Sequence, residues 1–117
     1  MSELKQIIVM RKDLKMPRGK EIAQGAHASM KATLMHFSDP RVKEWLEGKF
    51  TKIAVGVNSE EELLDVLNRA RAAGIIAELC TDAGLTVFNG VPTNTCIAVG
   101  PDTHERLQPI TGSLKLL

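Results

Sequence analysis

Several residues in the stretch MPRGKEIAQGAHASM, residues 16–30, carry side chains that can bind anions or transfer protons. Lys20, Gln24 and His27 follow one another at intervals of four and three residues, and Lys31 continues the series. In a helix these four side chains share a stripe about 60° wide. An ammonium group at the beginning of a helix, beside unpaired backbone N–H groups, favours a negatively charged ligand or reaction intermediate.

A carboxylate with potential for chemistry occurs later in the chain. Asp82 follows an apolar run in the sequence TDAGLT, and hydroxyl groups lie nearby at Thr86, Thr93 and Thr95. A carboxylate at a strand end can orient a water molecule or accept its proton, while a lysine from another loop stabilises developing negative charge. The same aspartate is also suited to closing an Asx turn. The residue types indicate hydrolysis by water and leave a purely structural role open.

Other catalytic and cofactor-binding motifs are absent from the sequence. It contains neither the GxSxG nucleophile elbow nor the GxGxxG dinucleotide motif. The Gly19–Lys20 pair lacks the first glycine and the following hydroxyl residue of a Walker loop. Cys80 and Cys96 lie in apolar surroundings without metal-ligand spacing, so we expect buried, reduced thiols. The sequence therefore contains no pattern that indicates a metal site or a nucleotide-binding site.

Positive charge is concentrated in the first half of the chain, although the formal net charge is only +1. Five basic side chains lie within ten residues, namely Arg11, Lys12, Lys15, Arg18 and Lys20. Such a cluster provides sequence-independent affinity for a polyanion such as RNA, but a solvated loop has the same composition, and composition alone does not choose between them. With three Phe, one Trp and no Tyr, base stacking on a row of aromatic side chains is not expected.

The length and hydropathy of the sequence limit its class. A chain of 117 residues fits one domain, which we assign to residues 1–117. No apolar run approaches the ~20 residues of a membrane span, and the first residues, MSELKQ, lack the apolar core of a signal peptide. The sequence therefore predicts a cytoplasmic protein without a membrane partner.

Short apolar runs alternate with helical patterns along the chain. Strands are expected at 5–10, 52–57, 75–80 and 95–100, and helices at about 20–37, 40–48, 59–73 and 101–108. This alternation is typical of an α/β fold with a mostly parallel sheet. Ligands of such folds bind beyond the strand ends, so the loops after the first and third strands are expected to form one site.

The long helix is expected to bury its apolar residues against the sheet. These residues lie together on a helical wheel and are Ile22, Ala23, Ala26, Met30, Thr33 and Leu34. The polar stripe that begins at Lys20 would then border the core. We also expect the leucines of the closing sequence, ITGSLKLL, to pack on the body of the protein.

Four stretches, KQIIVMRKDLKMPRGKEIAQGAHASM, TDAGLT, TNTCIAVGP and ITGSLKLL, together resemble the type 2 (archaeal and eukaryotic-type) peptidyl-tRNA hydrolases. The resemblance runs nearly end to end. It implies a single three-layer α/β/α domain with a four-stranded mixed sheet, and a homodimer. It also implies hydrolysis of the ester bond between a peptide, or an N-blocked amino acid, and the 3′-terminal ribose of tRNA, without metal or organic cofactor.

Position by position, the resemblance implies catalytic roles for Lys20, His27, Asp82, Thr86 and Thr93, with Thr95 as an alternative to Thr93. We assign contacts with tRNA to Arg11, Lys12, Lys15, Arg18, Gln24 and Lys31. Either His27 or Asp82 is a suitable general base.

The sequence departs from the family pattern at Gly25, within the long helix, and at two places in the loop after the third strand. Leu85 stands where family members commonly carry arginine, and VFNGVPTNT replaces the usual stretch that leads to a Gly-Thr pair. The two departures in the loop support an alternative, a non-catalytic protein of the same fold that binds tRNA or another protein. A nucleotide-binding α/β enzyme with a phosphate site at Lys20 is less favoured, because the nucleotide motifs are missing.

Overall fold

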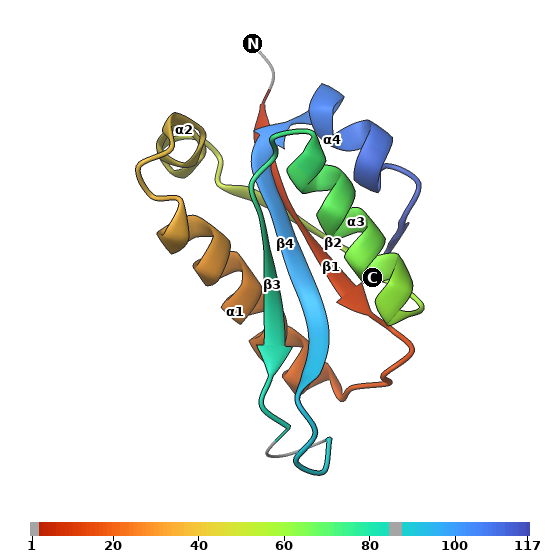
Figure 1. Ribbon diagram of the computed structural model, residues 1–117. Helices are drawn as coiled ribbons and strands as arrows, with labels where there is room; N and C mark the ends of the chain where they lie inside the picture. The colour runs from red at the N-terminus through yellow and green to blue at the C-terminus, as the bar shows by residue number, and fades with distance from the viewer. Residues whose placement is uncertain (1–2, 85–87) are drawn as a thin grey trace.

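The computed structural model describes residues 3–84 and 88–117, and its strands form one open sheet (Figure 1). The strands are β1 (Leu4–Arg11), β2 (Thr51–Val57), β3 (Ala77–Asp82), β4 (Thr93–Thr103) and β5 (Lys115–Leu116). The helices are α1 (Arg18–Met35), α2 (Pro40–Glu47), α3 (Glu60–Ala72) and α4 (His104–Thr111). Because α1 and α2 cover one face of the sheet and α3 and α4 the other, the predicted three-layer α/β/α fold is confirmed.

The strand pairing differs from the predicted four-stranded, mostly parallel sheet. The order is β3-β4-β1-β2-β5, with β1 and β2 as the one parallel pair among the described strands. β4 is antiparallel to both β1 and β3, and β5 is antiparallel to β2. β1, β2 and β3 nevertheless run in the same direction, so β1 and β3 end at the same edge of the sheet. This is the edge at which the sequence places the candidate site.

Each face of the sheet has its own hydrophobic core. On one face Leu63, Leu67 and Ala70 of α3 pack with Leu107 of α4. The other core is formed by small side chains of α1 together with Val42, Met10, Cys96 and Ala98. The N-terminus of α3 is capped, because the Ser59 hydroxyl accepts a hydrogen bond from the Glu62 N–H at 3.0 Å.

The prediction of which α1 residues face the sheet is wrong: of the six predicted residues, only Thr33 is buried. The buried residues of this helix are small or polar: Gln24, Gly25, Ala28, Ser29, Ala32 and Thr33. Large apolar side chains point outward instead, with Ile22 67%, Met30 57% and Leu34 59% exposed. The Ser29 hydroxyl donates to Oε1 of Gln6 in β1 at 2.5 Å, so the buried hydroxyl of Ser29 has a hydrogen-bond partner in the sheet. This orientation carries Gln24 inward.

The C-terminal segment packs on the sheet only in part. Leu114 packs against the α3 core, and the Leu117 N–H donates to the Ala54 carbonyl at 3.1 Å. Leu116 and Leu117 are 75% and 54% exposed, so the predicted packing of the tail leucines is confirmed for Leu114 alone. Within the described residues, no helix has the length and hydropathy needed to cross a membrane.

Candidate functional site

Lys20 and Asp82 form an ion pair at the edge of the sheet. Lys20 lies in the first turn of α1 and Asp82 is the last residue of β3. Lys20 Nζ donates to Asp82 Oδ1 at 2.6 Å, and the two side chains are 17% and 11% exposed. The loop regions that follow the first and third strands therefore meet, as the sequence predicts.

Gln24 connects this ion pair to the interior. Its side chain lies one helical turn after Lys20 and is 3% exposed. Gln24 Nε2 donates to Asp82 Oδ1 at 3.3 Å, while its Oε1 accepts from Thr95 Oγ1 at 2.5 Å and from Cys80 Sγ at 3.2 Å. These two donors fix the amide so that its NH₂ group points at Asp82. A buried amide held in this way is placed to orient Asp82.

Thr95 reaches Gln24 because the pairing of β3 with β4 is irregular at this point. Cys80 lies opposite Cys96, but Thr81 lies opposite Asn94, so Thr95 is the extra residue of β4. A bulge of this kind re-aims a side chain and disturbs the strict alternation of faces. Consequently Thr95 and its neighbour Cys96 both contact Gln24, one at the side chain and the other at the backbone carbonyl.

The Asp82 carboxylate is held by donors on both oxygens. Besides the contacts to Oδ1, the Gly84 N–H donates to Oδ2 at 2.8 Å, which closes an Asx turn. The Lys20 hydrogen bond, with smaller contributions from the Gly84 N–H and from the charges of Lys20 and His27, lowers the pKa of Asp82 below its ordinary value. The aspartate thus closes the expected Asx turn and also pairs with Lys20.

His27 and Lys31 continue the polar stripe of α1 along a cleft of about 320 Å³. The cleft also contacts Gln24, Cys80 and Asp82, and it opens to solvent at the exposed side chain of His27. Lys31 Nζ donates to the Leu79 carbonyl at 2.9 Å. The cleft, together with Lys20 beside Asp82, therefore combines two cations, a carboxylate and an imidazole, the groups needed to polarise an ester and to activate water.

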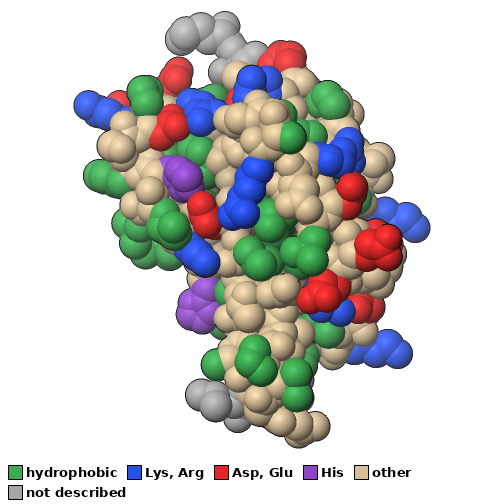
Figure 2. Space-filling view, viewed as in Figure 1, with side chains coloured by type: hydrophobic (Ala, Val, Ile, Leu, Met, Phe, Trp, Pro, Cys, Tyr) green, Lys and Arg blue, Asp and Glu red, His purple; other side chains and the backbone are tan. Residues whose placement is uncertain are grey.

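The predicted tRNA-binding residues are distributed on two sides of α1. Lys31 lies at the cleft beside β3, whereas Arg18 lines a groove on the opposite side of the helix, towards β2. Lys12 is exposed there and forms a 2.6 Å ion pair with Glu21, and Lys15 is also exposed. In the view of Figure 2, basic and acidic side chains are interspersed.

Arg11 is directed into the protein. It forms two hydrogen bonds with Asp13, at 2.7 and 3.2 Å, and donates to the Asn94 carbonyl at 3.0 Å. The hydrogen bonds with Asp13 raise the pKa of Arg11. With its side chain only 12% exposed, Arg11 fixes the loop after β1 to β4 and has little surface available for a phosphate.

The threonines near Asp82 have different positions. Thr86 lies outside the described residues, as does Leu85. Thr93 Oγ1 donates to the Val91 carbonyl within its own loop at 2.8 Å, and the structure places Thr95, not Thr93, in the hydrogen-bond network of Asp82.

Sequence reasoning predicted the burial of Cys80 but missed its place in the cleft. Both cysteines are buried and unbridged. Cys80 precedes Asp82 by two residues in β3, and side chains two apart in a strand share a face. This spacing was a usable signal for a residue beside the site.

Metal ligands do not cluster in the described part of the chain. No group of three or more His, Cys, Asp or Glu side chains among those residues could hold a metal ion.

Comparisons with known proteins agree over almost the entire chain. The family model described as "Peptidyl-tRNA hydrolase PTH2" matches residues 4–117. A protein of Methanocaldococcus jannaschii named peptidyl-tRNA hydrolase is 44% identical over 116 residues, which cover 97% of this chain and 100% of the relative. A protein of the same name from Methanothermobacter thermautotrophicus is 43% identical over 115 residues, with 97% and 100% coverage. The chain therefore belongs to the PTH2 family of peptidyl-tRNA hydrolases.

Proposed function

We propose that this protein hydrolyses the ester bond between a peptide, or an N-blocked amino acid, and the 3′-terminal ribose of tRNA. The observation that carries the proposal is the buried edge of the cleft, where Lys20 and Gln24 hold the Asp82 carboxylate. Membership of the PTH2 family over residues 4–117 supports hydrolysis rather than binding alone. The substrate also favours a cytoplasmic location.

Lys20 and Asp82 have different roles in the reaction. Water attacks the ester carbonyl, negative charge develops on the carbonyl oxygen, and the ribose oxygen leaves with a proton. The Lys20 ammonium group stabilises the developing charge, since a fixed cation in a partly buried site acts strongly on it. Asp82 orients the attacking water. Its lowered pKa keeps the carboxylate charged at neutral pH but makes it a weak base.

His27 is suited to proton exchange at the mouth of the cleft. Its ring is exposed and lies close enough to Asp82 and Cys80 to contribute to the lowering of both pKa values. We assign to it the transfer of a proton between the attacking water and the ribose oxygen, with Asp82 as the alternative base.

The acceptor arm of tRNA would cross the N-terminal end of α1. Lys12, Lys15 and Arg18 are exposed there, and Lys20 lies in the first turn that leads into the cleft. Lysine and arginine contacts with phosphates position a nucleic acid without reading its sequence. Arg11 contributes through the loop that it fixes.

A hydrolysis assay on N-acetylaminoacyl-tRNA tests the proposal. Wild-type protein should release the N-acetylamino acid, and Asp82→Asn should lower kcat by about 100-fold or more, because the carboxylate that orients the attacking water is lost. Asp65→Asn, at an exposed position on α3, is the matched control and should retain wild-type turnover. A wild-type protein that binds the tRNA but releases no product would support the non-catalytic alternative.

We further propose that the protein forms a homodimer through the outer face of α1. The apolar side chains exposed on and just after this helix are Ile22, Met30, Leu34, Met35 and Phe37. In Figure 2, hydrophobic side chains gather over α1 at the left margin of the molecule. Exposed apolar surface of this extent is typical of an interface, and a two-fold axis allows one patch to cover its own copy.

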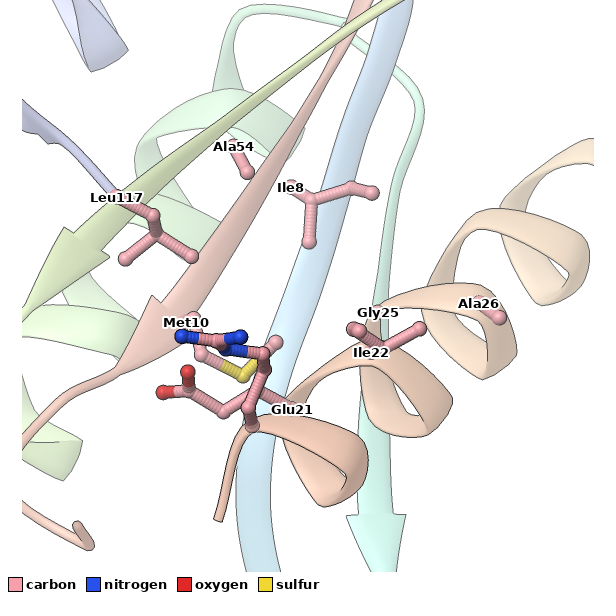
Figure 3. A pocket seen from close by; sticks show the side chains of 9 residues that line it. Ile8, Met10, Glu21, Ile22, Gly25, Ala26, Ala54 and Leu117 are labelled. Carbon is pink, nitrogen blue, oxygen red and sulfur yellow. The ribbon is translucent and has the colours of Figure 1, made fainter. Parts of the chain in front are cut away.

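An apolar groove beside α1 extends this surface. The groove has a volume of about 290 Å³ and is lined on the sheet side by Ile8, Met10, Ala54 and Leu117 (Figure 3). α1 leaves this part of the sheet uncovered because the helix lies over β3 and β4 (Figure 1). A second copy seated on α1 would also close the groove.

A further inference from the structure

Cys80 and Cys96 lie directly opposite one another on β3 and β4. Directly opposite residues of an antiparallel pair point to the same face, with Cα atoms about 4.5–5.5 Å apart. A disulfide bond needs Cα atoms about 4.4–6.8 Å apart, and the separation typical of directly opposite residues lies in this range. Both thiols lie in the core between the sheet and α1, beneath Gln24.

The two thiols differ in their access to solvent. Cys80 lines the cleft and is 8% exposed, whereas Cys96 is completely buried. A small oxidant entering the cleft therefore meets Cys80 first.

We propose that Cys80 and Cys96 are a peroxide-oxidisable thiol pair, and that the disulfide between them switches off the cleft above it. The loss of activity rests on the proposed hydrolase function, whereas formation of the disulfide does not. Reduction of the disulfide by a dithiol would restore the active arrangement.

The chemistry proceeds in two displacement steps. The Cys80 sulfur attacks one oxygen of hydrogen peroxide, the O–O bond breaks, and the other oxygen leaves as water with the thiol proton, giving a sulfenic acid. The Cys96 sulfur then attacks the Cys80 sulfur, the S–O bond breaks, and a second water leaves with the Cys96 proton. The two thiols together lose two electrons, which reduce the peroxide to two molecules of water.

Gln24 transmits the change to Asp82. In the reduced protein Cys80 Sγ donates to Gln24 Oε1 and Cys96 Sγ donates to the Gln24 carbonyl, both at 3.2 Å. A disulfide removes both S–H donors and draws the sulfurs to about 2.05 Å from each other. Gln24 then loses one of the two donors that orient its amide, and with it the fixed position of the NH₂ group that donates to Asp82.

Peroxide treatment of the purified protein tests the chemical step without any tRNA. In the wild type, both free thiols should disappear, the intact mass should fall by two hydrogens, and dithiothreitol should reverse both changes. In Cys96→Ala, dimedone should instead trap a sulfenic acid on Cys80, because the resolving thiol is missing. Thiols that stay free in treated wild type, or a dimedone adduct on Cys96 of Cys80→Ala, would overturn the assignment.

The hydrolysis rate, measured before and after treatment, tests the consequence. The wild-type rate should fall about tenfold or more, as expected for losing a hydrogen bond to a charged group, and dithiothreitol should restore it. The Cys80→Ala/Cys96→Ala variant, compared with its own untreated sample, should not respond. If that variant does not fold, reversal in the wild type still identifies thiol oxidation, since dithiothreitol does not repair methionine sulfoxide.

The two proposals fail in distinguishable ways. Disulfide formation with an unchanged hydrolysis rate would overturn the switch and leave the hydrolase function standing. Absence of hydrolysis by the untreated wild type would overturn the proposed function, whereas the mass and thiol measurements would still decide whether the disulfide forms.

Discussion

The Asp82 carboxylate shows how one side chain serves both structure and chemistry. Its Oδ2 accepts from the Gly84 N–H and closes the turn after β3, while its Oδ1 faces Lys20 and Gln24. Because these donors favour the charged form, folding and a lowered pKa are linked. Asp82 contributes stability above the pKa of the unfolded chain, and this contribution is lost as pH falls through the lower pKa of the folded protein.

Replacing Lys20 by methionine should raise the pKa of Asp82. The Lys20 hydrogen bond is the largest cause of the lowering, and partial burial of the carboxyl acts in the opposite direction. NMR titration of the Asp82 carboxyl carbon should give a midpoint below the ordinary value of 3.8 in the wild type and a higher midpoint in Lys20→Met. Lys43→Met, at an exposed position on α2, should leave the midpoint unchanged. Equal midpoints in all three proteins would exclude the ion pair in solution.

Replacing Thr95 by valine should lower hydrolysis about tenfold with a loss of stability of about 1 kcal/mol, because one buried hydrogen bond is removed. The hydroxyl that orients the Gln24 amide is lost, while the shape of the side chain is kept. Thr95→Ser should recover most of the activity. The measurements are kcat for N-acetylaminoacyl-tRNA and the midpoint of urea unfolding.

Thr93→Val is the matched control for Thr95. The Thr93 hydroxyl contacts only the Val91 carbonyl of its own loop among the described partners, so its loss should leave kcat within about twofold, as for most surface changes. A larger effect at Thr93 than at Thr95 would reverse the assignment. The two threonines could not be separated from the sequence, because they are two residues apart and strict alternation places both on one face. The bulge at Thr95 decides between them.

At the scale of elements, the turn after β3 depends on Gly84. Its φ of +83° is unfavourable for other residues, and an added Cβ would lie 2.4 Å from the Val91 carbonyl oxygen. Gly84→Ala should therefore destabilise the protein by about 1–3 kcal/mol. It should also lower hydrolysis, since the turn holds Asp82 through the Gly84 N–H. Thermal unfolding and kcat are the measurements.

Gly90→Ala is a control that has the backbone strain of Gly84→Ala without its steric clash. Gly90 has a similar φ of +80°, but an added Cβ there would meet no atom within 4 Å. The stability of this variant should fall only by the cost of the left-handed conformation, about 1 kcal/mol. Its hydrolysis rate should be unchanged. Equal losses for the two alanine variants would show that contact with Val91 does not matter.

The orientation of α1 shows where the sequence pattern misleads. A helical wheel groups Ile22, Met30 and Leu34, and burial of large apolar residues is the usual rule. In the structure Gly25, Ala28 and Ala32 face the sheet instead, because small side chains allow the helix to pack closely on it. The polar stripe from Lys20 to Lys31 is still correctly grouped, and this grouping is what brings the stripe to Asp82.

At the scale of the whole molecule, the directions of β1 and β3 could be inferred from the sequence but their partners could not. Short apolar runs indicate strands without indicating their neighbours. The run at β4 follows β3 after a loop and inserts between β3 and β1 as an antiparallel strand. β5 has only two residues, Lys115 and Leu116, both exposed, so no hydrophobic pattern marks it. Lys20 and Asp82 are in contact, as predicted, although the strand pairing differs from the prediction, because β1 and β3 end at the same edge of the sheet.

A charge placed on the outer face of α1 should dissociate the proposed dimer. The chain mass is 12.8 kDa, so light scattering after gel filtration should give about twice this mass for the wild type and the monomer mass for Met30→Glu. Asn68→Glu introduces the same charge at an exposed position of α3, on the opposite layer, and should remain dimeric. Because Met30 is 57% exposed in the single chain, Met30→Glu should fold normally by circular dichroism. A monomeric wild type, or a Met30→Glu dimer as stable as the wild type, would exclude this face as the interface and leave the apolar groove beside α1 without an occupant.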